Sequence, residues 1–149
     1  MDTAEAVARE GIRHVIARYN YAGDRGRLDE LVACFTEDGV MELPDLPPLR
    51  GREAIHGHLA GVARSLAAAS QRVLLRHHVA SLFIDSVRDD QASASACFSV
   101  YTEIGLDHWG VYRDRLRRVD GPEGEWLLAH RKVRVDGAVA GSRMVGRDE

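Results

Sequence analysis

The chain has 149 residues, of which 45% are hydrophobic and 29% charged, a composition typical of one soluble globular domain with a real core. The formal net charge of −3 gives no overall attraction for nucleic acid. No apolar stretch approaches the roughly 20 residues of a membrane span. We therefore expect neither a nucleic-acid nor a membrane partner.

The first third of the chain has the spacing of helices. Apolar residues between positions 4 and 19 recur every three or four residues, which predicts an amphipathic helix. Asp2 and Glu5 stand where a capping box would begin it. Gly23 breaks the pattern, and a shorter helix is predicted over residues 28–35.

A short strand is predicted at residues 40–43, followed by a proline-rich loop and a third helix from about 52 to 70. Everything beyond has the β-branched and aromatic pattern of strands. The runs are 73–87, 92–103, 107–119 and 125–135. Helices followed by long strands favour an α+β fold with an antiparallel sheet, and helices covering a curved sheet leave room for a ligand cavity.

One domain is predicted over residues 1–137, with a loosely ordered polar tail at 138–149. The first residues have neither the basic nor the apolar region of a signal peptide. Cys34 and Cys97 have no metal-binding or redox spacing, so we interpret both as reduced core residues. A cytoplasmic location follows from these expectations.

Six short segments occur in one order along the chain. They are Tyr19 with Asp24, FTEDGV at 35–40, GREAI at 51–55, LRHHV at 75–79, GVYRD at 110–114 and WLLAHR at 126–131. Together they resemble the SnoaL-like, scytalone-dehydratase-like branch of the nuclear-transport-factor-2-like (NTF2-like) superfamily. The resemblance implies a cone-shaped fold, in which a curved antiparallel sheet covered by three N-terminal helices encloses a pocket. This fold hosts dehydratases, isomerases, cyclases, epoxide hydrolases and binding modules.

In the dehydratase-like pattern, an aspartate after the first helix and a histidine on the first long strand face the pocket. The resemblance places these at Asp24 and His78. Asp24 also stands just before the second predicted helix, where aspartate is a favoured N-cap. His77 and His78 point to opposite faces of a strand, and alternation alone does not choose between them. Only the resemblance selects His78.

The chain departs from that pattern at three places. Gly23 and Leu43 stand where the family's dehydratases carry tyrosines, and Cys97 or Phe98 stands where they carry a second pocket histidine. We therefore do not expect dehydration of the family's fungal naphthol substrate.

The pocket is expected to have an aromatic lining. Its candidates are Tyr19, Phe98, Trp109 and Tyr112, with ordinary core packing as the alternative. The histidines show no zinc-like spacing, and the chain contains no G-x-S-x-G, P-loop or G-x-G-x-x-G motif. We therefore expect no metal and no cofactor.

Asp114 and Arg131 fall on neighbouring predicted strands and are interpreted as a buried ion pair. An epoxide-hydrolase relative of this fold uses an Asp-Arg-Asp arrangement, which Asp114 with Arg131, or Arg134 with Asp136, matches only in part.

The sequence thus predicts a cofactor-free dehydratase, isomerase or cyclase acting on a small apolar carbonyl or phenolic, polyketide- or steroid-like compound. Asp24 and His78 would be its acid–base pair, because a histidine can give and take a proton near neutral pH. The alternatives are a non-catalytic module that binds a small hydrophobic ligand, and an epoxide hydrolase. Sheets of this type often associate through their outer face, so we expect a homodimer.

Overall fold

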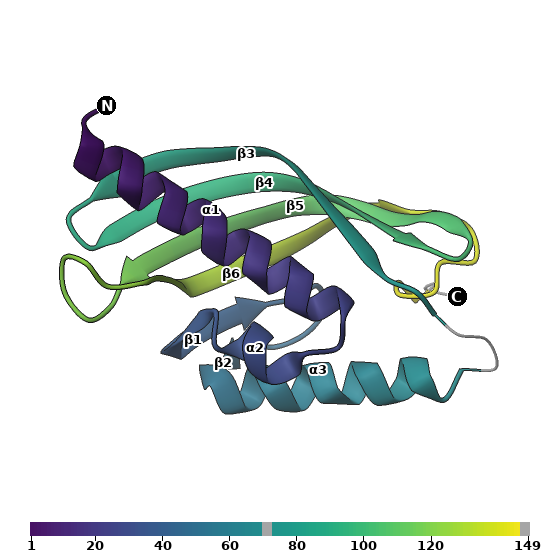
Figure 1. Cartoon of the computed structure of the whole chain (residues 1–149). Coiled ribbons are helices and arrows are strands. Elements are labelled where there is room, and N and C mark those ends of the chain that lie inside the picture. The colour runs from purple at the N-terminus through teal and green to yellow at the C-terminus, as the bar shows by residue number, and fades with distance from the viewer. Residues whose placement is uncertain (70–72, 147–149) are drawn as a thin grey trace.

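Three helices precede four long strands, as expected, in the computed structural model of the chain, which describes residues 1–69 and 73–146 (Figure 1). The helices are α1 (Thr3–Asp24), α2 (Leu28–Val32) and α3 (Gly51–Ala67). The strands are β1 (Phe35–Glu42), β2 (Leu49–Arg50), β3 (Arg76–Arg88), β4 (Gln91–Thr102), β5 (Gly105–Arg118) and β6 (Trp126–Ala138). The predicted end of the third helix, at residue 70, lies outside the described residues.

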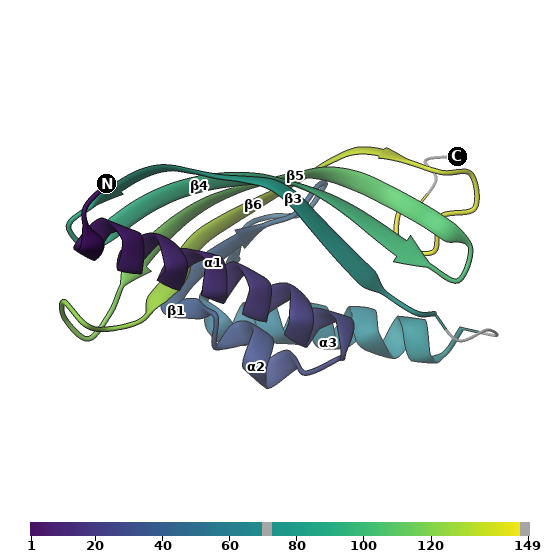
Figure 2. The same ribbon diagram turned by 45° about the horizontal axis from the view of Figure 1, so that its top comes forward.

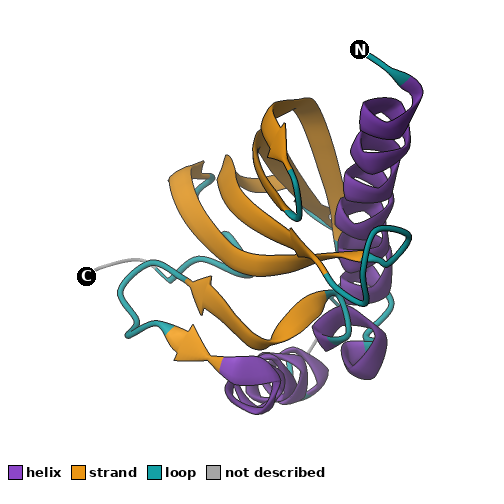
Figure 3. Ribbon diagram, turned by 90° about the vertical axis from the view of Figure 1, so that its left-hand side faces the viewer, coloured by secondary structure: helices purple, strands orange, loops and turns teal. Residues whose placement is uncertain are grey.

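The strands form one sheet in the order β2-β1-β6-β5-β4-β3. The antiparallel pairing of β3, β4, β5 and β6 confirms the sequence prediction. β1 adds a feature that was not predicted, because it pairs in parallel with β6 and antiparallel with β2. The sheet curves strongly, and the three helices lie on its concave side (Figures 2 and 3).

α1 crosses the concave face and packs against β3 and β6. Its buried stripe includes Ile12, Val15, Ile16 and Tyr19, which have the predicted three- and four-residue spacing. The carboxylate of Asp2 accepts a hydrogen bond from the backbone N–H of Glu5 at 2.8 Å, so the predicted N-cap is confirmed.

The other predicted cap is wrong. Asp24 is the last residue of α1, and α2 begins at Leu28 with Arg27 at its N-cap and no side-chain capping bond. The N-cap of α2 thus lies three residues after Asp24, the position that the sequence pattern favoured. The Asp24 carboxylate is therefore available for another partner.

α3 lies apart from α1, against β1, β2 and α2. Arg52 ties its first turn to β1 by donating from Nε and Nη2 to the carbonyl oxygen of Phe35, at 2.8 and 2.6 Å. Ile55 is fully buried, whereas Leu59 and Val62 on the following turns are only partly buried. The side chains of these later turns line the cavity described below.

The two cysteines differ in environment. Cys34 is buried as predicted, but Cys97 is exposed on the outer face of β4, so the prediction that it lies in the core is wrong. Within the described residues, no helix has the length and apolar character needed to cross a membrane. Of the predicted tail, residues 147–149 lie outside the described residues.

Candidate active site

A cavity of about 1060 Å³ lies between the concave face of the sheet and the helices. Most of its walls are apolar, and they come from α1, α3, the 43–46 loop and the inner residues of the long strands. The polar side chains of the lining are Tyr19, Asn20, Asp24, Asp45, His58, His77, His108 and Tyr112. The described part of the lining contains no lysine or arginine, so it favours a neutral ligand over an anionic one.

Asp24 and His77 meet at one side of this cavity. His77 Nδ1 lies 2.6 Å from Asp24 Oδ1, and the backbone N–H of His77 donates to both carboxylate oxygens at 3.1 and 3.0 Å. The carboxylate side chain is 8% exposed and the imidazole 22%. Because a carboxylate only accepts hydrogen bonds, Nδ1 carries a proton and Nε2 is the nitrogen left for a ligand.

The structure does not bring Asp24 and His78 together. His78 is exposed on the outer face of β3, where its ring lies 4.8 Å from that of Tyr101. The apolar neighbours Leu75 and Val79 share the inner face with His77, as strand alternation requires. The prediction that His78 faces the cavity beside Asp24 is therefore wrong, because His77 has that position. The apolar character of positions 75 and 79 was the signal for it.

A second histidine that lines the cavity is also hydrogen-bonded to a carboxylate. His108 Nδ1 lies 2.8 Å from Asp107 Oδ1, with the imidazole 11% exposed and the carboxylate fully buried. Val100 pairs with His108 and Tyr101 with Leu106, so Asp107 is an extra residue in a β-bulge. The bulge allows two consecutive side chains to touch, which a regular strand would send to opposite faces.

His77 and His108 stand at the same level of the sheet. His77 on β3 and His108 on β5 both pair with Val100 on the strand between them. Two strand spacings separate their Cα atoms by roughly 10 Å. Both side chains line the cavity, so a ligand between them would have an imidazole on each side.

Three of the four predicted aromatic residues line the cavity. Phe98 and Tyr112 stack with ring centroids 4.6 Å apart, Tyr19 closes the α1 side, and the Tyr112 hydroxyl donates to Asn20 Oδ1 at 3.4 Å. Burial raises the pKa of Tyr112 far above its ordinary value, so its hydroxyl stays protonated. Trp109 is 39% exposed and lies outside the cavity, so its predicted place in the lining is wrong.

The predicted ion pair of Asp114 and Arg131 lies beneath these rings. Arg131 donates from Nε and Nη2 to the two carboxylate oxygens at 2.8 and 2.7 Å, and both side chains are almost fully buried. Its guanidinium carbon lies 4.3 Å from the Tyr19 ring centroid and 4.1 Å from that of Tyr112. Burial would lower the pKa of Arg131, but the charge and hydrogen bonds of Asp114 raise it.

Neither arrangement considered for epoxide opening faces the cavity. Asp114 and Arg131 are not among the residues that line it, and Arg134 with Asp136 forms an exposed pair, 2.7 Å from Nε to Oδ1. Within residues 1–69 and 73–146, no group of three or more histidine, cysteine or acidic side chains is placed to hold a metal ion.

The sequence interpretation missed His108, Asp107, Asn20 and His58. Position 108 has the same parity as position 112 on β5, so alternation from Tyr112 was a signal that His108 faces inward. Asn20 lies beside Tyr19 on the buried side of α1. No sequence signal marked the bulge that turns Asp107 inward.

A protein-family comparison matches residues 4–132 to a model described as a SnoaL-like domain. The chain belongs to the SnoaL-like domain family. Among curated proteins, none matches the chain. The cavity of this SnoaL-like domain does contain a second histidine, His108, at a position other than Cys97 or Phe98.

Solved structures agree with this fold. A protein from Catenulispora acidiphila, in complex with S-DNPA, is 31% identical with a TM-score of 0.74, covering 88% of this chain and 95% of its own. An NTF2-like protein with a cystatin-like fold from Novosphingobium aromaticivorans is 25% identical, with a TM-score of 0.74 and coverages of 93% and 88%. ActVI-ORFA from Streptomyces coelicolor is 22% identical, with a TM-score of 0.74 and coverages of 86% and 97%. This SnoaL-like domain thus has the NTF2-like fold.

Proposed function

We propose that this chain is an enzyme that transfers protons on a neutral, largely apolar carbonyl or phenolic compound without a cofactor. The observation that carries the proposal is a pair of carboxylate-held imidazoles, His77 and His108, in one apolar cavity. Asp24 orients the first and Asp107 the second. Relative to the expectation from sequence, His77 takes the place of His78 and His108 joins it.

The two imidazoles supply the base and the acid that dehydration needs. Neutral Nε2 of one ring removes a proton from the carbon next to a carbonyl. The other ring, as imidazolium, gives its proton to the departing hydroxyl, which leaves as water while a carbon–carbon double bond forms. The proton then returns from the first ring to the second through solvent. Each positioned proton transfer is worth roughly 10²–10⁴ in rate.

Isomerisation and cyclisation need only part of this arrangement. One imidazole removes a proton beside the carbonyl. In isomerisation the enolate is then protonated at another carbon. In cyclisation its carbon attacks a second carbonyl carbon of the same molecule, whose oxygen takes up the proton. The Tyr112 hydroxyl, which burial keeps protonated, is a hydrogen-bond donor at the cavity wall. The absence of tyrosine at Gly23 and Leu43, which both line the cavity, favours these reactions over dehydration of the fungal naphthol type.

A step common to all three reactions is removal of the proton beside a carbonyl. We would incubate the protein with 2-tetralone, a neutral two-ring ketone, in D₂O and follow deuterium entry at the carbons flanking the carbonyl by NMR. The rate of exchange catalysed by the protein, after subtraction of the rate in buffer alone, should fall by on the order of a hundredfold in His77→Gln and in His108→Gln. His78→Gln is the matched control and should keep the wild-type rate. Full exchange in both cavity variants would overturn the proposal.

A non-catalytic binding module is the second candidate, and the mostly apolar walls of the cavity favour it. Fluorescence titration with 1-naphthol measures binding independently of turnover. Two results together would support the binding module over the enzyme. The wild-type protein would bind 1-naphthol without exchanging 2-tetralone, and His77→Gln and His108→Gln would bind 1-naphthol as tightly as wild type.

A further inference from the structure

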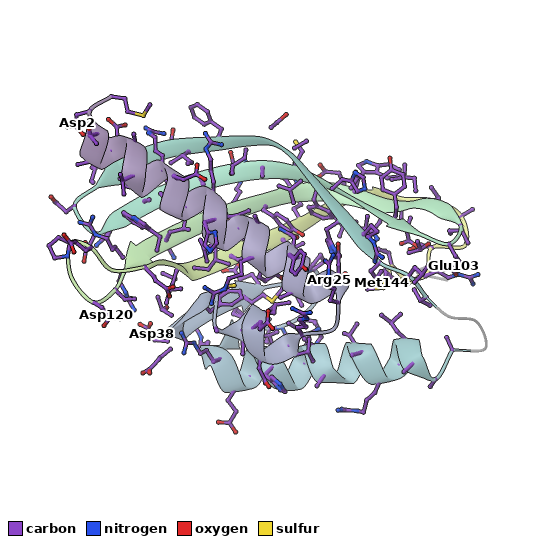
Figure 4. The ribbon with its side chains drawn as sticks, in the orientation of Figure 1. Asp2, Arg25, Asp38, Glu103, Asp120 and Met144 are labelled. Atoms are coloured by element: carbon purple, nitrogen blue, oxygen red, sulfur yellow. The ribbon has the colours of Figure 1, made fainter. Side chains whose placement is uncertain are left out.

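Residues 139–146, the C-terminal strap, follow β6 and form one end wall of the cavity. Met144, Val145 and Gly146 contribute to the lining. The strap begins where the backbone N–H of Val139 donates to the carbonyl oxygen of Asp107 at 2.9 Å. Arg143 Nε donates to Glu103 Oε1 at 2.7 Å, and Figure 4 shows Met144 and Glu103 at the same end of the molecule.

The carboxylate of Asp107 joins this strap to His108. Oδ1 accepts from the Ser142 hydroxyl at 2.6 Å and pairs with His108 Nδ1 at 2.8 Å, while Oδ2 accepts from the backbone N–H of Arg143 at 2.6 Å. Burial would raise the pKa of Asp107, but the donors Ser142, Arg143 and His108 together lower it. The group is therefore an anion at neutral pH, although it is fully buried.

Ser142 fixes the direction of the strap as well as its attachment. Its hydroxyl oxygen accepts from the backbone N–H groups of Met144 at 3.2 Å and Val145 at 2.9 Å. A hydroxyl has two lone pairs and one proton, so its proton goes to Asp107. One hydroxyl thus closes the turn that places Met144 and Val145 in the cavity wall and holds the carboxylate that binds His108.

We infer that Asp107 is a positioning residue for His108, and that Ser142 couples the seating of the C-terminal strap to the orientation and tautomer of that imidazole. The inference rests on the proposed function, since it explains how Asp107 and Ser142 hold His108 for proton transfer in the same site. With the strap seated, Asp107 holds the proton of His108 on Nδ1 and leaves Nε2 free for the ligand. With the strap detached, Asp107 loses two of its donors and the cavity loses an end wall.

The coupling works in both directions. A ligand that packs against Met144 and Val145 stabilises the seated strap, and the seated strap stabilises the reactive form of His108. A ligand that makes no contact with this wall gains no such help, so contact with Met144 and Val145 becomes a determinant of specificity. We therefore expect the preferred substrates to contact Met144 and Val145 as well as His108.

The test uses the full chain without any ligand. Long-range ¹H–¹⁵N correlation spectra of the histidine rings report which ring nitrogen carries the proton, and His108→Gln assigns the His108 signals. Wild-type protein should show His108 as a single Nδ1–H tautomer when neutral. Ser142→Ala should convert this to a mixture and shift the methyl signal of Met144, whereas Ser142→Thr, which keeps the hydroxyl, should restore both. Ser99→Ala, on the outer face of β4, is the matched control.

Asp107→Asn provides a second measurement if Ser142→Ala proves unstable. It should weaken the Nδ1–H preference of His108, because a neutral amide oxygen is a poorer acceptor than a carboxylate, and lower 2-tetralone exchange by at least about tenfold. An unchanged His108 tautomer and Met144 signal in folded Ser142→Ala would overturn the inference, whatever the activity. Normal exchange in His77→Gln and His108→Gln, with the tautomer change present in Ser142→Ala, would overturn the proposed function and leave the coupling intact.

Discussion

Asp24 binds His77 through the ring and the backbone at once, although 53 positions separate them in the chain. The contact joins the last residue of α1 to the second residue of β3. It therefore fixes the rotation of the imidazole and also the point at which β3 passes the helix. A change at Asp24 has two separable effects, one on charge and one on hydrogen bonding.

Asp24→Asn separates these effects. Asparagine keeps one oxygen acceptor for the His77 backbone, so we expect a loss of only about 1 kcal/mol in the free energy of unfolding. The carboxylate charge and its hold on Nδ1 disappear, so 2-tetralone exchange should fall by on the order of a hundredfold. The measurements are urea unfolding and deuterium incorporation.

Asp29→Asn is a matched control for this change. Asp29 also faces a histidine, with its Oδ1 3.2 Å from His56 Nε2, but that pair is exposed and lies outside the cavity. Asp29→Asn should therefore alter neither the free energy of unfolding nor the rate of 2-tetralone exchange. If Asp24→Asn behaved like Asp29→Asn, the Asp24–His77 contact would be structural only.

Because of Asp107, the free energy of unfolding should depend on pH in the acidic range. Its pKa in the folded chain is lowered, so the stabilisation that it provides is complete above the unfolded value of about 4 and is lost as the pH falls through the folded value. Asp107→Asn should cost about 1–3 kcal/mol at pH 7, because it weakens hydrogen bonds to a buried anion. The difference from wild type should narrow below about pH 4. Urea unfolding from pH 3 to 7 measures this.

Asp136→Asn is the control for that series, because Asp136 belongs to an exposed ion pair with Arg134. Exposed ion pairs contribute little to stability, so the unfolding curve of Asp136→Asn should follow wild type at every pH. A constant difference between Asp107→Asn and wild type down to pH 3 would contradict the assignment of an ionised, hydrogen-bonded Asp107.

The buried pair of Asp114 and Arg131 should be strongly coupled. Asp114→Leu alone leaves a buried guanidinium without its anion and should cost about 3–5 kcal/mol of unfolding free energy. Arg131→Met alone should cost a similar amount. The double variant should be more stable than either single variant, because no buried charge remains. Additive losses in urea unfolding would show that the two side chains act independently.

Much of the fold could be predicted because the local sequence patterns match the helices and strands that form. The α1 stripe, the Asp2 cap and the four antiparallel strands all follow from short-range periodicity. The parallel pairing of β1 with β6 could not be predicted in this way, because it joins segments about 90 residues apart. The places of Asp114 and Arg131 on neighbouring predicted strands also gave their buried ion pair correctly.

The site was harder to predict because its decisive features break the regular patterns. The bulge at Asp107 turns a residue inward that alternation sends outward, and the N-cap of α2 lies three residues beyond Asp24, which therefore does not cap that helix. His78 was chosen on family resemblance, whereas the apolar neighbours of His77 favoured the inner face for that residue. Trp109 was placed in the pocket on its residue type, although positions 109 and 112 have opposite parity.

Gly110 offers a test of how tightly β5 and β6 pack behind the aromatic wall. A Cβ built at this position would overlap the carbonyl oxygen of Arg134 and lie 2.9 Å from Cζ of Phe98. The oxygen belongs to the backbone of the paired strand, so it cannot yield without distorting the ladder. Gly110→Ala should therefore lower the free energy of unfolding by about 1–3 kcal/mol and weaken 1-naphthol binding, because Phe98 and its partner Tyr112 must shift.

Gly57→Ala is the matched control for Gly110→Ala. Gly57 lies in the middle of α3, where an added Cβ has no neighbour within 4 Å. Alanine has the higher helix propensity, so this change should raise the free energy of unfolding by about 0.5–1 kcal/mol and leave 1-naphthol binding as it is. Thermal unfolding measures the stability change, and fluorescence titration measures 1-naphthol binding. If the β5–β6 contact is as close as described, the two variants should change stability in opposite directions. Equal or improved stability in Gly110→Ala would mean that the strands separate readily at this level and that the aromatic wall is not held by them.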